Sequence, residues 1–341
     1  MVFSKPRQDP SHDRDLKIQG MNVPIVQTYK YLGIELSADD DYLSHHGEKL
    51  TKAANTAIQR LNARSLWKFN RFEISKTLWK ATAVTQLTYC NAVITLPKRI
   101  QNLLETRQRD AGRWALGLPN STIAKEFIEG ELGWSSFEAR ESVSKLMYFE
   151  RIKNLDQDRW PKLILEAMKL THTKVKSIER SKILRKLYDL ESIKLTQDTS
   201  GRLEWNKFRK QIRESLRTRS DTQWRKSMES KSTLLVYRQF EETRGLLTNL
   251  YDNSRGSRLL ALTRAGMLNT RSRLHKYDTS IDPNCPHCGR PESDRHVVLG
   301  CDEDGDTEQE FARRIGLSPN PEAKTLRRTK ATLSAWERQL K

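Results

Sequence analysis

Apolar side chains recur at helical spacing over most of this chain, which predicts a mainly α protein. The first such run begins near residue 43 and includes Leu50, Ala54, Ala57, Ile58 and Leu61. Similar runs predict helices over residues 72–93, 99–116, 136–154, 159–170, 178–191 and 205–219. Residues 14–36 differ, because apolar and polar positions alternate on both sides of Gly20-Met21-Asn22. That alternation predicts a small N-terminal β element, either a hairpin or a small sheet.

Proline, glycine and polar stretches mark the expected ends of these elements. Breaks are expected at Leu96-Pro97, at Gly117-Leu118-Pro119 and from Gly130 to Gly133, with further boundaries at 192–203 and 278–284. The signals predict a β element over 1–40, a helical bundle over 41–191, a basic helical connector over 192–280, a Cys/His segment over 281–304 and a C-terminal tail over 305–341.

The chain is strongly basic, with 61 Lys and Arg against 43 Asp and Glu and a net charge of +18. Residues 171–280 carry most of this excess, with 25 Lys and Arg but 12 Asp and Glu. Such an excess favours RNA or DNA as a partner, because each neutralised phosphate releases condensed counterions. The sequence contains neither a signal peptide nor a window of about 18 apolar residues. We therefore expect an intracellular protein, nuclear or cytoplasmic, that is not secreted and has no membrane contact.

Two basic segments are the expected contacts to a phosphate backbone. Residues 205–219 predict an amphipathic helix with Trp205, Phe208, Ile212 and Leu216 on one stripe. Around this stripe lie Arg209, Lys210, Arg213 and Arg217. The second segment precedes the cysteines and supplies Arg264, Arg271, Arg273 and Lys276. For both segments the alternative is a solvated helix face without a partner.

Three of the four cysteines fall within 17 residues, in CPHCGRPESDRHVVLGC. The pattern Cys285-x2-Cys288-x7-His296-x4-Cys301 has the spacing of metal ligands, and Gly289 supplies the backbone freedom that a tight knuckle needs. Three thiolates and one imidazole fill all four tetrahedral positions, which predicts a structural zinc ion. His287 would strain the chelate and is expected outside the ligand set. Ordinary reduced cysteines are the alternative.

The stretch YLGIELSADDD, residues 31–41, places Ala38-Asp39-Asp40 directly after an apolar run, as in a two-metal polymerase site. The residues that follow are polar and lead into a helix, and the aspartates that precede the apolar run are limited to Asp9, Asp13 and Asp15. We therefore expect Asp39, Asp40 and Asp41 to cap that helix, and we assign no catalytic residue. His45 and His46 point to different helix faces and are expected to be solvated or to cap.

Several segments together resemble the C-terminal half of the reverse transcriptase polyprotein of LINE-like, non-LTR retrotransposons. MVFS resembles the end of the palm strand after the catalytic box, and YKYLGIEL (29–36) resembles the strand that leads to the thumb. RWALGLP (113–119) and ELGWSSFEAR (131–140) resemble landmarks of the helical region that follows. LTRAGMLNTRSRLHKY, followed by CPHCG, Glu292, His296 and Cys301, resembles the C-terminal zinc knuckle. The cysteine pattern is the specific motif of a resemblance that extends from residue 1 to about 301.

The resemblance implies a palm remnant over 1–40, a bundle like a polymerase thumb over 41–191 and a zinc knuckle over 281–304. In that family the catalytic Tyr-Ala-Asp-Asp precedes the segment matching MVFS, so we expect the catalytic palm to be absent from these residues. The implied function is to bind nucleic acid for an RNA-directed DNA polymerase. The chain is expected to be inactive alone, with the rest of a reverse transcriptase as its partner. One alternative is an active polymerase assembled with another polypeptide. Another is an interaction scaffold or a decayed transposon product without activity.

Overall fold

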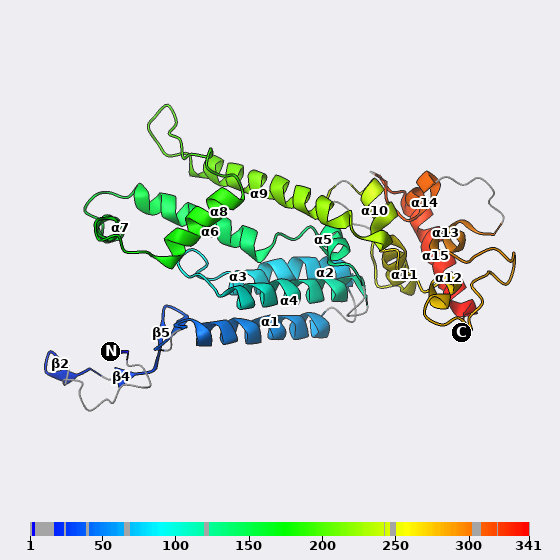
Figure 1. Ribbon diagram of the computed structural model, residues 1–341, viewed down its shortest axis with the longest axis horizontal. Coiled ribbons are helices and arrows are strands. Elements are labelled where there is room, and N and C mark those ends of the chain that lie inside the picture. The colour runs from blue at the N-terminus through cyan, green and yellow to red at the C-terminus, as the bar shows by residue number, and fades with distance from the viewer. Residues whose placement is uncertain are drawn as a thin grey trace. The chain divides into compact units, whose positions relative to one another are not determined.

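A computed structural model describes residues 2–3, 17–23, 25–38, 41–64, 69–118, 123–241, 243–245, 250–301, 308–318 and 320–340. The protein is mainly helical, with short strands in its N-terminal part, as the apolar periodicity predicts (Figure 1). The chain forms two compact units. Unit 1 comprises Met1–Ile58, Thr82–Arg107 and Ser136–Arg213, and unit 2 comprises Gln59–Ala81, Gln108–Ser135 and Glu214–Lys341. Both units draw on the segments 41–191 and 192–280, so the units are not contiguous in sequence.

The strands of unit 1 form two-stranded sheets. β1 (Val2–Phe3) pairs in parallel with β4 (Ile25–Val26). The antiparallel pairs are β2 (Lys17–Ile18) with β3 (Met21–Asn22), and β5 (Thr28–Tyr31) with β6 (Ile34–Ser37). These two hairpins close at Gln19-Gly20 and Leu32-Gly33, where all four residues have positive φ. Positive φ at both turn residues matches the twist of the strands. The predicted hairpin is confirmed, and a second one follows it.

The helices of unit 1 agree closely with the apolar periodicity. It holds α3 (Thr85–Leu87), α6 (Phe137–Lys153), α7 (Trp160–Leu170) and α8 (Lys176–Leu187), and parts of α1 (Ser44–Arg64), α4 (Lys98–Leu116) and α9 (Trp205–Met228). α6 packs against both α7 and α8. The Ser136 hydroxyl caps α6 by accepting a hydrogen bond from the Ala139 N–H at 3.1 Å. The predicted break at Leu96-Pro97 is confirmed, since α4 begins at Lys98.

A buried lysine fixes the loop between α3 and α4 onto α6. The Lys145 Nζ donates hydrogen bonds to the carbonyl oxygens of Asn91 at 2.9 Å and Ile94 at 2.5 Å. Burial lowers the pKa of Lys145 to about 8, although the Glu141 carboxylate 3.6 Å away opposes this shift. The lysine therefore acts as a bridge between a loop and a helix inside unit 1.

The helices of unit 2 include the whole C-terminal part of the described chain. They are α2 (Arg71–Leu78), α5 (Lys125–Leu132), α10 (Leu235–Phe240), α11 (Arg255–Arg264), α12 (Arg271–His275), α13 (Asp294–Leu299), α14 (Glu308–Arg314) and α15 (Ala323–Gln339), with a 3₁₀ turn η3 (Ser232–Leu234). The remaining parts of α1, α4 and α9 also belong to unit 2. α15 packs against α11, α13 and α14. Leu326 and Leu333 of α15 are buried. The segment 305–341, predicted as a tail, therefore contributes to the core of unit 2.

One helical prediction is corrected and one predicted break is located. The run predicted over 72–93 is shorter, because α2 continues through a π-helical segment η2 (Trp79–Val84) into α3, which ends at Leu87. The break predicted from Gly130 to Gly133 is confirmed at its last residue, because α5 ends at Leu132 and Gly133 follows with φ +60°, whereas Gly130 itself lies within the helix. A Cβ on Gly130 would lie 2.4 Å from the Tyr237 Oη and 2.7 Å from the Trp224 Cζ2. This glycine is thus a packing requirement within a helix.

The aspartates of the ADDD stretch lie just before α1, the helix that they are predicted to cap. Asp39 and Asp40 lie outside the described residues, as do Asp9, Asp13, Asp15 and Pro119. The Asp41 Oδ1 accepts a hydrogen bond from the Leu43 N–H at 3.2 Å, just before α1 begins. The expectation for His46 is wrong, because this side chain is only 2% exposed. Burial accordingly lowers the pKa of His46.

Candidate metal centre

The four predicted ligands come together in unit 2. The ligand atoms of Cys285, Cys288, His296 and Cys301 all lie within 4.8 Å of one another. The Cys285 and Cys301 Sγ atoms are 3.8 Å apart, and the His296 Nε2 is 3.5 Å from the Sγ of both Cys288 and Cys301. A tetrahedron with zinc-ligand bond lengths has about 3.8 Å between two sulfurs and about 3.5 Å between sulfur and nitrogen. The group could therefore hold a metal ion, and its separations are consistent with zinc.

Local backbone structure explains how CPHC forms a knuckle. The Cys285 N–H donates to the Arg290 carbonyl at 2.7 Å, and the Gly289 N–H donates to the Cys285 carbonyl at 2.9 Å. Gly289 takes φ +70°, a conformation that glycine adopts without the strain of a side chain. The sulfurs of Cys285 and Cys288 are thereby directed toward the same point from one tight loop.

The other two ligands come from α13 and the residues directly after it. The Ser293 hydroxyl caps α13 by accepting a hydrogen bond from the His296 N–H at 3.2 Å. Val297, Val298 and Leu299 are buried on the same short helix and hold it against the core. Gly300, with φ +106°, then turns the chain so that Cys301 reaches the cluster. His287 is exposed and does not belong to the group.

The thiols of the cluster differ in acidity. Burial alone would raise the pKa of Cys285, but hydrogen bonds from the His287 backbone and the His296 side chain outweigh it and lower that pKa to about 6. Burial and the neighbouring thiols raise the pKa of Cys301 to about 12. Without a cation, therefore, the Cys285 and Cys301 thiols do not ionise together. A bound metal removes this conflict, since it favours the thiolate at every position.

Glu292 connects the knuckle to the start of α12. Its side chain is buried, and its Oε1 accepts a hydrogen bond from the Arg271 N–H at 2.9 Å. The Ser272 hydroxyl donates to the Pro283 carbonyl at 3.0 Å, on the other side of the same connection. In the sequence, Glu292 is identified only through the family resemblance. Its role in positioning α12 depends on contacts that spacing along the chain does not reveal.

The predicted basic residues divide by exposure. Arg209, Lys210 and Arg213 are exposed on the part of α9 in unit 1, and Arg217 is exposed in unit 2, 3.7 Å from Asp221. Phe208, Ile212 and Leu216 are buried, so the amphipathic character predicted for this helix is confirmed. Lys276 is exposed, whereas Arg271 and Arg273 are partly buried. The Arg273 Nη1 donates to the Gly266 carbonyl at 3.0 Å.

Arg264 is not available to a phosphate, because its side chain is 0% exposed. Its Nη2 lies 2.7 Å from the Glu131 Oε1 and 3.1 Å from the Glu241 Oε2. Its Nη1 donates to the carbonyls of Ile315 and Gly316. Burial would lower the pKa of Arg264, but the surrounding carboxylates outweigh it and raise that pKa. Arg264 therefore belongs to a structural ion cluster within unit 2 and does not contact a phosphate backbone as predicted.

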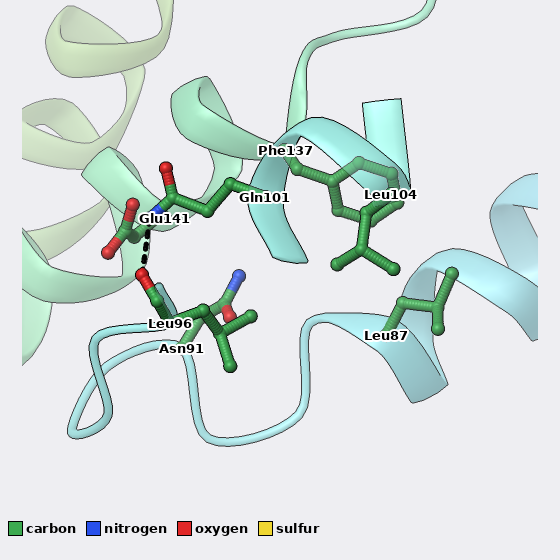
Figure 2. Close-up of a pocket in the computed structure, with 7 residues that line it drawn as sticks. All are labelled: Leu87, Asn91, Leu96, Gln101, Leu104, Phe137 and Glu141. Atoms are coloured by element: carbon green, nitrogen blue, oxygen red, sulfur yellow. Dashed lines mark hydrogen bonds between the residues drawn. The ribbon is translucent and has the colours of Figure 1, made fainter. Parts of the chain in front are cut away.

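A small cavity in unit 1 offers no comparable site (Figure 2). It has a volume of about 10 Å³ and is lined by Leu87, Asn91, Leu96, Gln101, Leu104, Phe137 and Glu141. The Gln101 amide closes one side by donating to the Leu96 carbonyl at 3.0 Å, the dashed line in Figure 2. The space suits a water molecule rather than a substrate.

The chain matches no protein family, and no curated protein or solved structure is significantly similar to it. Among the residues that the structure describes, no second group of three or more His, Cys, Asp or Glu side chains has the geometry of a metal site. None of the described helices is long and apolar enough to cross a membrane.

Proposed function

We propose that this chain is a nucleic-acid-binding part of a retrotransposon reverse transcriptase, with a structural zinc ion in its C-terminal unit. The observation that carries the proposal is the Cys3His cluster, whose four ligand atoms lie within 4.8 Å of one another and whose Cys285–Cys301, Cys288–His296 and His296–Cys301 separations are consistent with zinc. The cluster also has the ligand order of the knuckle that LINE-like elements carry. The thumb-like role of the helical bundle and the polymerase context rest on the sequence resemblance.

The ligand set supports a structural role for the metal. All four tetrahedral positions are supplied by the protein, which leaves none for a water molecule or substrate. The two halves of the cluster come from the loop at 285–288 and from α13 with its following turn. A cation would join them, and through Glu292 it would also hold the start of α12.

Metal content provides the direct test. The purified chain should contain one zinc ion per molecule, and Cys288→Ser should lose it. Cys90→Ser is the matched control, because Cys90 lies in unit 1 and outside the ligand group, and it should retain the metal. A wild-type chain without stoichiometric metal, or one whose melting temperature does not change on chelation, would contradict a structural zinc site.

Exposed positive charge supports the nucleic-acid part of the proposal. Arg209, Lys210 and Arg213 lie beside the buried stripe of α9, so the helix is fixed while its basic residues face outward. Such residues bind phosphates by displacing counterions, and this binding weakens as salt is added. Arg217, Arg271, Arg273 and Lys276 are the further contacts proposed in unit 2.

A salt titration of RNA and DNA binding tests this part. Replacing Arg209, Lys210 and Arg213 with alanine should weaken binding and reduce the slope of log K against log salt by about 2–3, if each residue contacts one phosphate. The control replaces Arg151, Lys169 and Lys182, which are exposed basic residues on α6, α7 and α8. It removes the same charge and should leave most of the slope intact. Affinity that is independent of salt would refute backbone recognition.

The alternative of an interaction scaffold has one observation in its favour. α7 exposes a row of apolar side chains at helical spacing: Trp160 at 75%, Leu163 at 45%, Ile164 at 48% and Leu170 at 81%. Exposed apolar residues that form such a row are typical of a protein interface. A chain that melts cooperatively and has no affinity for RNA or DNA would favour this alternative.

A further inference from the structure

A groove lies in unit 2, between the end of α9 and α10. It has a volume of about 550 Å³ and is lined by Arg225, Met228, Glu229, Leu235, Arg238, Gln239 and Glu241. This volume is in the range of small-molecule sites, roughly 300–1,000 Å³. None of these residues was singled out by the sequence patterns, because the groove exists only where the chain folds back after α9.

Internal contacts hold the walls of the groove in place. The Arg238 Nη1 donates to the carbonyls of Met228 at 3.5 Å and Glu229 at 2.7 Å, which fixes α10 to the end of α9. Glu241 is held by Arg264, with 3.1 Å between the Glu241 Oε2 and the Arg264 Nη2. The groove is thus shaped before a ligand enters, and this reduces the entropy lost on binding.

The lining combines three kinds of surface. The half-exposed Leu235 provides apolar area, whereas Met228 is only 1% exposed and closes the groove from within the core. Gln239 and Glu229 provide exposed amide and carboxylate groups. Arg225 and Arg238 add two guanidinium groups. Glu229 offsets part of the positive charge of Arg225 and Arg238, whereas Glu241 is already paired with Arg264, so the groove is weakly basic rather than a strong anion site. The part of a ligand that enters it is expected to be neutral, flat and rich in hydrogen-bonding groups.

We propose that this groove receives an unstacked base of single-stranded nucleic acid. A base has an apolar face for Leu235 and a polar edge for Gln239 and Glu229, while guanidinium groups can stack on bases or contact the adjoining phosphate. A duplex buries its base faces in stacking, so it does not present such a group. The inference rests on the proposed function and adds to it a preference for single strands.

The test compares single-stranded and duplex RNA of the same sequence, with the full chain and two groove variants, Gln239→Ala and Leu235→Ser. Both side chains are exposed, with Leu235 at 50%, so neither change should alter folding, and thermal melting verifies this. Each variant should weaken single-strand binding by at least about fivefold, which is the low end for losing one base contact. Duplex binding should not change.

Matched controls separate the groove from a general surface effect. Gln223→Ala alters an exposed glutamine that lies in α9, outside the groove. Leu187→Ser alters a leucine of α8 that is 49% exposed. Both should bind single strands like the wild-type chain. Photo-crosslinking with 4-thiouracil in the single strand should label residues 225–241.

The outcomes distinguish the two proposals. If the wild-type chain binds nucleic acid but the groove variants retain full single-strand affinity, or lose single-strand and duplex binding equally, the groove is not a base site and the proposed function stands. If the wild-type chain binds neither single strands nor duplexes, both proposals fail.

Discussion

Arg264→Met tests whether the buried ion cluster stabilises unit 2. The Arg264 side chain is 0% exposed and that of Glu131 is 2% exposed. The Arg264 Nε and Nη2 contact the Glu131 Oε1 at 3.2 and 2.7 Å, and the Nη1 donates to the Ile315 and Gly316 carbonyls. Methionine replaces much of the volume but none of the donors. Glu131 would then be a buried charge without its counterion.

The magnitude follows from what the substitution leaves behind. Removing one partner of a buried ion pair costs about 3–5 kcal/mol, because the remaining charge is neither solvated nor paired. Glu241 adds less, because its side chain is 12% exposed and burial already raises its pKa to about 7. We therefore expect Arg264→Met to lower the free energy of unfolding by about 3–5 kcal/mol.

Urea unfolding followed by circular dichroism measures this change. Arg255→Met is the control on the same helix, because Arg255 is 42% exposed and pairs with Glu337. An exposed pair contributes about 0–1 kcal/mol. The double variant Glu131→Gln with Arg264→Met removes the buried charge and keeps an acceptor for the Tyr251 hydroxyl, which bonds Glu131 at 2.6 Å. It should be more stable than Arg264→Met alone. The reasoning is refuted if Arg264→Met costs no more than Arg255→Met.

Three further predictions concern the packing around Gly130, the contact of Glu292 with the start of α12, and the pH dependence of stability through His46. Gly130→Ala should lower the free energy of unfolding by about 1–3 kcal/mol in a urea titration, because its Cβ would overlap Tyr237; an unchanged midpoint would contradict this. Glu292→Ala should lower the melting temperature, because it removes the acceptor of the Arg271 N–H. The metal content should stay at one ion per chain. Loss of the metal would show that Glu292 acts on the ligands instead. Burial and the nearby Lys49 lower the pKa of His46 while Glu35 opposes them, so the unfolded chain binds the proton more readily. The free energy of unfolding should be highest above about pH 6.5 and should decrease as the pH is lowered below that value. His46→Leu should reduce this decrease, as measured by urea titrations across the same pH range.

Much of the secondary structure follows from local patterns. The apolar residues every three or four positions predict α1, α4, α6, α7 and the start of α9, because a helix places such residues on one face. The ligand group was also accessible from sequence. Cys285, Cys288, His296 and Cys301 lie within one short segment, so their spacing alone limits how they can meet.

Residues whose partners are distant in the chain required the tertiary structure. The sequence patterns that predict Arg264 as a basic contact contain nothing of Glu131, which lies 133 positions away and forms its buried ion pair. Likewise, the sequence around Gly130 does not show that this glycine lies within a helix for packing, because Tyr237 and Trp224, which leave no space for a Cβ, come from a later part of the chain. Local spacing determined the helices and the ligand set, whereas burial and the pairing of charges depended on which segments pack together. That packing depends on the sum of many contacts across the chain, whereas a local sequence pattern contains only one of the two residues in each long-range contact.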